Sequence, residues 1–373
     1  GERVGSGFAV SGVNYSGSTL ALKYLTMRQR PELSALKTKG LNMVTTVVAA
    51  FNEFMKDTVN LRKADTDDAR ASRDWLIGKI NDFEKDNAFP VSYPAIHIAF
   101  GSFARRTKIR PLDDIDLMFG LSAQGATYNI LSDRITLTSS GEGSRLHGYR
   151  HSGADTICSV RILNAFKSHL QDIAQYAQAD IRRNQEAVTL KLISKDWNFD
   201  IVPCFMTSED VFGRTNYLIP DGNGHWKFTD PRKDRDRVTT INVQNDGNVL
   251  NVIRAVKYWQ RRPTMPSMSS YLLETLILDY YASRTSCSSF VDIELEALFR
   301  HLGLFVQFSV NDPKGIQGDI NSLSAEARQA ISDRCYLDAQ KASEARWFEK
   351  GKEYEKSINK WRDLFGPFFP IYG

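Results

Sequence analysis

Two aspartates, Asp114 and Asp116, stand one residue apart where a nearly continuous apolar run begins, and this pair constrains the fold more than any other feature. The run from Ile115 to Leu121 is typical of a buried strand. Side chains alternate across a strand, so both carboxylates project from one face, roughly 7 Å apart, while Ile115 points into the core. Two carboxylates on one face repel each other unless a cation lies between them.

A metal site is one interpretation of the pair. A hard divalent ion such as Mg²⁺ prefers oxygen ligands and leaves positions open for water and phosphate oxygens. The alternative interpretation is a solvated acidic strand end, which a lone Asp-x-Asp often marks.

A glycine–serine pair and several cations precede the aspartates. Alternating residues 96–100 predict a strand that leads directly into Gly101 and Ser102. Glycine lets the backbone approach a phosphate because it has no Cβ, and exposed amides, with the Ser102 hydroxyl, would hold the anion. A basic stretch follows, with the cations Arg105, Arg106, Lys108 and Arg110. It either attracts a triphosphate or forms a solvated loop.

A third acid, Asp200, lies in another predicted strand with the sequence WNFDIVP. Phe199 precedes it and Ile201 follows it, so burial of this carboxylate would be costly unless it is paired or bound to metal. Across the sheet from Asp114 and Asp116, it would complete a cage for two metal ions about 3.5–4 Å apart. A polyanion bridged through metal would then explain the acids and the basic stretch together.

The pattern around these motifs is that of an α+β protein. Helical periodicity runs through residues 41–55 and 75–83, and an amphipathic helix is predicted at 160–176. Residues 90–205 predict a mixed sheet with a helix between its strands. The polar stretch 122–156, rich in Gly and Ser, predicts a hairpin plus a mobile loop.

From about residue 245 the chain is expected to be helical. One apolar stripe runs over residues 249–259 and ends at Pro263, another covers 271–278, and a last one runs from 347 to 365. The tail GPFFPIYG, after the last stripe, is expected to be flexible.

Length and charge limit the classes of protein to consider. A chain of 373 residues is long enough for one large two-lobed unit or two domains. The net charge of +4 is too small to predict a nucleic-acid polymer as a stable partner, although it permits basic patches that bind small polyanions. No apolar run approaches the ~18 residues of a spanning helix, and the first residues do not have the pattern expected of a secretion signal. We therefore expect no membrane partner and a cytoplasmic protein.

The cysteines favour the same compartment. They lie far apart, without a CxxC motif, at Cys158, Cys204, Cys287 and Cys335. Free, mostly buried thiols in a reducing cytoplasm explain them. His147 and His151, together with Cys158, have a spacing that begins some zinc sites, but surface histidines in a loop are the favoured interpretation because no CxxC partner follows.

The order of these motifs resembles the polymerase-beta type of nucleotidyltransferase. More closely, it resembles the CD-NTases, bacterial relatives of cyclic GMP-AMP synthase with a SMODS nucleotidyltransferase domain, which act in CBASS anti-phage defence. GSFARRTKIRPLDDIDLM is close to the family's GS-to-DID stretch, and EAVTLKL followed by WNFDIVPCF resembles its third-acid strand. NYLIPDGNGHWKFTDPR, and NVIRAVKYWQRR followed by SSYLLETL, resemble its later motifs. The match touches residues 96–280; the segment before Gly101 and the stretch 122–156 are longer than the family pattern.

The resemblance implies a fold and a set of site residues. The fold is a polymerase-beta-like core with N-terminal helices, residues 1–240, and a helical C-terminal lobe, residues 241–373, with the active site in the cleft between them. The implied catalytic ligands of two Mg²⁺ ions, for which Mn²⁺ is a substitute, are Asp114, Asp116 and Asp200. The implied nucleotide-binding residues are Gly101, Ser102, Lys257 and Ser270 on the donor triphosphate, and Tyr271 stacked on a base. Two alternatives stay open: Tyr271 as a core residue and Lys257 as a solvated helix residue.

The resemblance also implies an activity. The family joins NTPs, here ATP and/or GTP, into a cyclic di- or trinucleotide second messenger and releases pyrophosphate; the product then acts on a downstream effector. In some family systems an E1/E2-like protein conjugates the C terminus of the synthase, and Gly373 is compatible with that. Two alternative functions stay open. One is a nucleotidyltransferase that acts on an RNA or protein acceptor, and the other is a catalytically silent nucleotide-binding scaffold.

Overall fold

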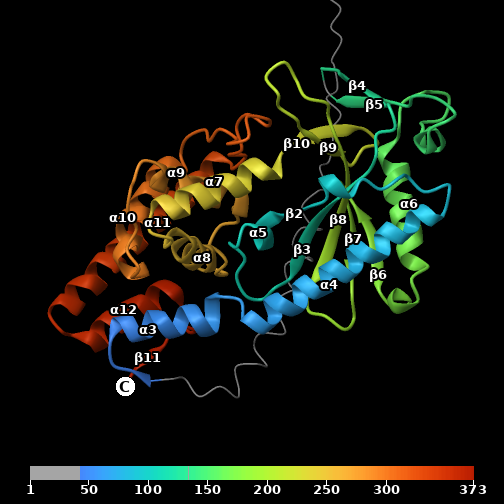
Figure 1. Ribbon diagram of the computed structural model, residues 1–373. Helices are drawn as coiled ribbons and strands as arrows, with labels where there is room; N and C mark the ends of the chain where they lie inside the picture. Colours follow the sequence, from blue (N-terminus) through green and yellow to red (C-terminus); the bar gives the residue numbers. More distant parts are fainter. Residues whose placement is uncertain (1–42, 133) are drawn as a thin grey trace, which may run out of the picture. The chain divides into compact units, whose positions relative to one another are not determined.

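A mixed sheet forms one part of the fold (Figure 1). The computed structural model describes residues 43–132 and 134–373, and in this part of the chain nine strands join in the order β2-β3-β8-β9-β10-β5-β4, with β7 pairing to β8 and β6 to β7. The strands of this sheet are β2 (Ile98–Phe100), β3 (Asp114–Gly120), β4 (Thr127–Ile130), β5 (Ile135–Thr138), β6 (Asp180–Asn184), β7 (Ala187–Lys191), β8 (Asn198–Met206), β9 (Tyr217–Pro220) and β10 (Trp226–Thr229). Residues 1–42 of the predicted domain 1–240, and with them the start of the stripe predicted from residue 41, lie outside the described residues.

Two strands that are far apart in the sequence form the centre of this sheet. β3 and β8 pair in parallel along the whole length of β3, from Asp114 opposite Asn198 to Gly120 opposite Cys204. At the start of both strands, half-buried and buried residues alternate, and the residues that follow are almost all buried. This is the pattern of strands that enter a core from a partly exposed end. The strands predicted from residues 96–100, 115–121 and WNFDIVP are thus confirmed.

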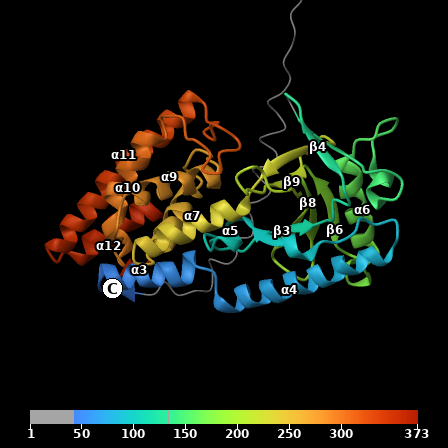
Figure 2. The ribbon, with the colours of Figure 1, turned by 45° about the horizontal axis from the view of Figure 1, so that its top comes forward.

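Two helices pack against the sheet. α4 (Lys63–Asn81) and α6 (Ser159–Gln171) lie beside it in both views (Figures 1 and 2). Leu76 of α4 and Phe166 of α6 are fully buried in the same hydrophobic cluster as Ile115 of β3. This arrangement confirms the predicted α+β class.

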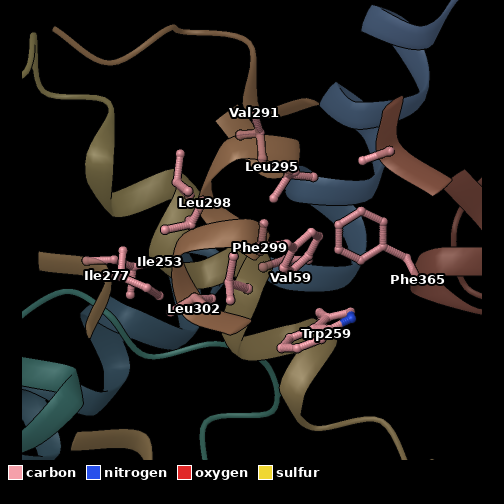
Figure 3. Close-up of a cluster of buried hydrophobic side chains, with 14 of the residues drawn as sticks. Val59, Ile253, Trp259, Ile277, Val291, Leu295, Leu298, Phe299, Leu302 and Phe365 are labelled. Atoms are coloured by element: carbon pink, nitrogen blue, oxygen red, sulfur yellow. The ribbon is translucent and has the colours of Figure 1, made fainter. Parts of the chain in front are cut away.

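The remaining helices share a second core. The longer helical elements are α3 (Val47–Glu53), η1 (Phe54–Val59), α7 (Pro231–Gln244), α8 (Val249–Gln260), α9 (Ser270–Ala282), α10 (Val291–Phe305), α11 (Ala325–Lys350) and α12 (Tyr354–Phe365). Figure 3 shows side chains from both ends of the described chain meeting here, with Val59 near Phe365, Trp259 and Phe299. α3 and η1 therefore pack with the C-terminal helices, and the predicted boundary at residues 240–241 falls within α7.

Short helical turns connect these elements. They are η2 (Asp82–Lys85), η3 (Pro94–Ile96), α5 (Gly101–Ala104), η4 (Arg145–Tyr149) and η5 (Ala174–Tyr176). The hairpin predicted within residues 122–156 is present as β4 and β5, paired antiparallel. The rest of that stretch does not fit the predicted mobile loop, because Leu146 is fully buried and Arg145 donates hydrogen bonds to the carbonyls of Glu84 and Phe89.

The predicted flexible tail is wrong. β11 (Ile371–Tyr372) pairs in parallel with β1 (Met43–Val44), and Phe369 is fully buried in the helical core. The last predicted helix also needs correction. α11 ends at Lys350, α12 begins at Tyr354, and Trp347 on α11 is 68% exposed instead of lying on the buried stripe.

Two other expectations bear on the environment of the protein. Within residues 43–132 and 134–373, no helix combines the length and the apolar character that crossing a bilayer requires. All four cysteines are free and buried, as predicted.

Candidate active site

Asp116 and Asp200 are opposite each other on β3 and β8. Neighbouring strands are roughly 4.8 Å apart, so the two carboxylates lie side by side on the same face. Burial, followed by the negative charge of Asp200, raises the pKa of Asp116 from 3.8 to about 6. Thr189 of β7, which is paired with Asp200, donates a hydrogen bond from Oγ1 to Asp200 Oδ1 at 2.5 Å. The sheet thus holds two acids in mutual repulsion, which a bound cation would relieve.

Gly101 lies directly against this pair. Its φ is +70°, in the left-handed region that favours glycine. A Cβ built on Gly101 would be 1.7 Å from Oδ2 of Asp116. The sequence predicts glycine here for access to a phosphate, and the structure adds a second reason, which is the close approach of the acid.

Ser102 closes a tight turn around the start of the basic stretch. Its carbonyl oxygen accepts hydrogen bonds from the backbone N–H groups of Thr107 at 2.9 Å and Lys108 at 3.1 Å. Lys108 then turns its ammonium group to Asp113 and Asp114, and forms ion pairs with both. Asp114 is therefore held by a cation of the chain itself.

The basic stretch is largely bound to protein groups. Arg105 donates to Glu274 of α9 at 3.0 and 3.1 Å, and Arg110 donates to the carbonyl of Lys56 at 2.9 Å. Arg106 is exposed, with φ of +63°. The solvated-loop interpretation is thus wrong for Arg105 and Arg110; attraction of a triphosphate stays a prediction.

Lys257 belongs to a buried charge cluster. Its ammonium group is 2.7 Å from Oε1 of Glu274, and both side chains are almost fully buried. Burial alone would raise the pKa of Glu274, but the cations of Arg105 and Lys257 outweigh it and hold that pKa below its ordinary value. Lys257 is therefore not a solvated helix residue. Its contact with a triphosphate stays a prediction.

Ser270 and Tyr271 begin α9. Ser270 is exposed, and the helix is capped by Ser269, whose hydroxyl accepts from the N–H of Tyr271 at 3.2 Å. Tyr271 is half-buried, and its hydroxyl can donate to Asp234 at 2.8 Å or to Asp312 at 2.9 Å. These polar contacts do not fit the apolar-core alternative for Tyr271, and stacking on a base stays a prediction.

A lysine completes the surroundings of Tyr271. The ammonium group of Lys314 donates to the tyrosine hydroxyl at 2.5 Å and lies 4.0 Å from the centre of the ring. Burial and the neighbouring carboxylates raise the pKa of Tyr271, so the phenol stays protonated. The ring is therefore held rigidly in place.

The acids fit a divalent cation in part. Asp116 and Asp200 offer adjacent carboxylate oxygens, which hard cations prefer, and Asp114 begins the same strand. Among the residues that the structure describes, no three His, Cys, Asp or Glu side chains lie close enough together to form a metal-binding cluster. Asp114 would have to leave Lys108 before it could join the other two acids.

The zinc alternative gains no support. Nε2 of His151 lies 3.2 Å from the carbonyl oxygen of Gly224, and its ring packs against that of His225. Among residues 43–132 and 134–373, His147, His151 and Cys158 do not form a metal-binding cluster.

Several residues around the acids were not found from the sequence. Thr189 lies in EAVTLKL, where the alternation places it on the same face as an acid of the neighbouring strand. Glu274 is a lone acid in the apolar run YLLETLIL, which is a usable signal of a buried ion pair. Asp234, Asp312 and Lys314 had no such signal, because their contacts join residues far apart in the chain.

Comparison with known proteins identifies the relatives of the chain. No family model matches it. It is 42% identical over 333 residues to a "Probable cyclic nucleotide synthase" of Bacillus cereus (strain VD146), a match that spans 88% of this chain and 99% of that protein.

Solved structures share the fold. The CdnC structure of Escherichia coli MS115-1 with ATP matches with a TM-score of 0.62 and 19% identity, over 86% of this chain and 98% of that chain. The structure of the Vibrio cholerae cyclic AMP-GMP synthase DncV with the linear intermediate 5′ pppA(3′,5′)pG matches with a TM-score of 0.62 and 12% identity, over 87% of this chain and 97% of that chain.

A mixed sheet with acids on adjacent parallel strands, joined to a helical lobe, defines the class as a polymerase-beta-like nucleotidyltransferase fold. Within that class, the identity to the curated relative decides the family. The chain belongs to the CD-NTase family of cyclic nucleotide synthases.

Proposed function

We propose that this protein joins NTPs into a cyclic di- or trinucleotide second messenger and releases pyrophosphate, as a nucleotidyltransferase. The observation that carries the proposal is the pairing of Asp116 with Asp200 beside Gly101. The proposal is also supported by the 42% identity of this chain to a protein named as a probable cyclic nucleotide synthase. Anti-phage defence in a CBASS system, a cytoplasmic location and a downstream effector of the product are part of the same proposal.

The substrates are proposed to be ATP and/or GTP. CdnC has been solved with ATP, and DncV with a linear intermediate that contains A and G. Those ligands belong to those proteins, and they support the same class of substrate here. The assay with labelled NTPs identifies the bases that enter the product.

The reaction needs little covalent chemistry from the protein. A ribose hydroxyl of the acceptor attacks the donor α-phosphorus in line, the bond from that phosphorus to the bridging oxygen of the β-phosphate breaks, and pyrophosphate leaves. Asp200 is proposed to help take the proton of the attacking hydroxyl. Catalysis then depends mainly on positioning and charge neutralisation.

Other side chains are proposed to orient the donor. Gly101 and Ser102 would hold its phosphates through backbone amides, Lys257 and Ser270 would contact its triphosphate, and Tyr271 would stack on a base. The ring of Tyr271 is already fixed by its hydroxyl contacts, so stacking would cost little conformational entropy.

Two Mg²⁺ ions are the proposed cofactors, with Mn²⁺ as a substitute. Asp116 and Asp200 would hold them, and Asp114 would join after it leaves Lys108. Bound there, the ions would acidify the attacking hydroxyl and neutralise the leaving pyrophosphate.

The test is an assay with the four labelled NTPs and Mg²⁺ or Mn²⁺, in which phosphatase-resistant products are separated. We expect such a product from the wild-type protein and none from Asp116→Asn. CdnC has been solved in complex with a HORMA protein, so the assay includes an arm with partner proteins encoded beside this chain. Absence of product in every arm, with the variant indistinguishable from wild type, would refute the proposal.

Conjugation of Gly373 by an E1/E2-like protein stays a prediction. Its backbone N–H donates to the carbonyl of Val44 at 3.2 Å. Deleting Gly373 and looking for the loss of conjugates in cells tests it.

A further inference from the structure

Lys108 turns away from solvent and toward the acids of the candidate site. Its ammonium group pairs with both Asp113 and Asp114, and its side chain is only 11% exposed. Lysine is rarely so buried unless an anion holds it. The Asp114 side chain, in contrast, is 41% exposed and open to an ion from solvent.

The position of Lys108 links the acids to the predicted phosphate-binding turn. The backbone N–H of Lys108 is bonded to the carbonyl of Ser102, so the lysine belongs to the turn that begins at Gly101. Gly101 in turn touches Asp116. An anion bound at Gly101 and Ser102 would therefore lie on the same turn as Lys108, whose ammonium group now neutralises Asp114.

The two acids that pair with Lys108 differ in the cationic partners that would remain if Lys108 moved away. Asp113 has a second cation, Arg261, at 3.1 Å. For Asp114, Lys108 is the cationic partner found among the described residues. If Lys108 moved, Asp113 would keep an ion pair and Asp114 would become available to a metal ion.

We propose that Lys108 is a positioning residue that makes metal binding depend on the nucleotide. In the nucleotide-free protein, its ammonium group holds the place of a cation beside Asp114 and disfavours a divalent ion there. A triphosphate carries several negative charges and is a stronger partner for the lysine than the carboxylates of Asp113 and Asp114. Lys108 moves to the triphosphate, Asp114 is released, and metal and nucleotide enter as one complex. This inference rests on the proposed function.

The experiment measures binding of Mn²⁺ to the full chain by the electron paramagnetic resonance of free Mn²⁺. The variants are Lys108→Met, which removes the charge and keeps the alkyl chain, and Lys108→Arg, which keeps the charge. Lys360→Met is the matched control, because Lys360 pairs with Glu344 at the surface of α12 and α11. Each protein is titrated alone and with an ATP analogue whose α,β-bridging oxygen is replaced by methylene, and the Mn²⁺ bound by the analogue without protein is subtracted.

Without nucleotide, we expect Lys108→Met to bind Mn²⁺ at least about tenfold more tightly than wild type, since a repelling unit charge is gone. Lys108→Arg and Lys360→Met should match wild type, and the analogue should tighten Mn²⁺ binding far more in wild type than in Lys108→Met. Adding Asp116→Asn to Lys108→Met should remove the gain. If Lys108→Met does not fold, as judged by circular dichroism, Lys108→Gln takes its place.

Equal or weaker Mn²⁺ binding by the uncharged variant would overturn the inference, and so would a gain that survives Asp116→Asn. Failure of the proposed function gives a different result, which is the absence of a cyclic product in the labelled-NTP assay, whatever the effect of Lys108→Met on Mn²⁺ binding.

Discussion

Gly101 and Asp116 approach each other so closely that a methyl group on the glycine would lie 1.7 Å from Oδ2 of the acid. Replacing Gly101 by alanine would displace the carboxylate and strain the backbone, whose φ is +70°. We expect a loss of roughly 10²-fold in the rate of cyclic nucleotide synthesis, the scale of a misplacement of about 1 Å. Gly78→Ala in α4 is the control, because nothing lies within 4 Å of its added methyl group. A Gly101→Ala protein as active as Gly78→Ala would contradict this placement of Asp116.

The raised pKa of Asp116 predicts an unusual dependence of stability on pH. Its pKa rises from 3.8 to about 6 on folding, so its carboxyl group favours the folded state below about pH 3.8. This contribution is lost as the pH rises through 6. Asp116→Asn should therefore gain free energy of unfolding over wild type between pH 4 and pH 7, by up to about 3 kcal/mol.

Urea denaturation in the presence of EDTA at several pH values measures this difference. In a separate series without EDTA, Mn²⁺ added together with an ATP analogue should stabilise wild type more than Asp116→Asn, because the ion favours the ionised carboxylates. A difference between the two proteins that does not vary with pH would show that the pKa of Asp116 is not raised by burial and by the charge of Asp200.

Glu274 should contribute strongly to stability. It is the shared anion of Arg105 and Lys257, and Glu274→Gln would leave two buried cations without a charged partner. We expect the free energy of unfolding to fall by about 3–5 kcal/mol. Glu344→Gln removes a surface pair with Lys360 and should cost roughly 0–1 kcal/mol. Thermal or urea unfolding of both variants compares them, and similar losses would mean that the Glu274 cluster is not buried in solution.

The packed tail gives a test of the corrected C terminus. Phe369 is fully buried among aromatic rings, and Phe369→Ala should lower the free energy of unfolding by about 3–5 kcal/mol. Its neighbour Phe368 is 40% exposed, and Phe368→Ala should have little effect. Equal, small effects in urea denaturation would restore the prediction of a flexible tail.

Local patterns were sufficient to predict the strands that carry the acids. The apolar run after Asp114 and the segment around Asp200 each read as a buried strand, and the structure has β3 and β8 there. Their register, which sets Asp116 opposite Asp200, depends on pairing between segments more than eighty residues apart. The costly burial of Asp200 and the resemblance to a family both suggested that these acids meet, but neither could give the register.

Long-range charge pairs could not be predicted in the same way. The partner of Arg105 lies 169 residues away, and nothing in the basic stretch distinguishes an arginine bound to Glu274 from one that is solvated. The prediction of a flexible tail was wrong for a related reason, because the position of Phe369 depends on aromatic rings from α3 and α12.

Helices with small or polar residues were also missed. α7 is rich in Arg, Lys and Asp, and it buries few large side chains, although Asp230 caps it and Pro231 begins it. α11 packs mainly through small residues such as Cys335, Ala339 and Ala342, which give no apolar stripe to read.

A mass spectrum of the nucleotide product tests the central claim most directly. Wild-type protein, incubated with NTPs, divalent metal and its partner proteins, should yield an ion with the mass of two or three nucleoside monophosphates joined in a ring. Asp200→Asn should yield none. If only linear products or tailed RNA appear, or if Asp200→Asn makes the ring as fast as wild type, the assignment of this site to cyclic nucleotide synthesis is wrong.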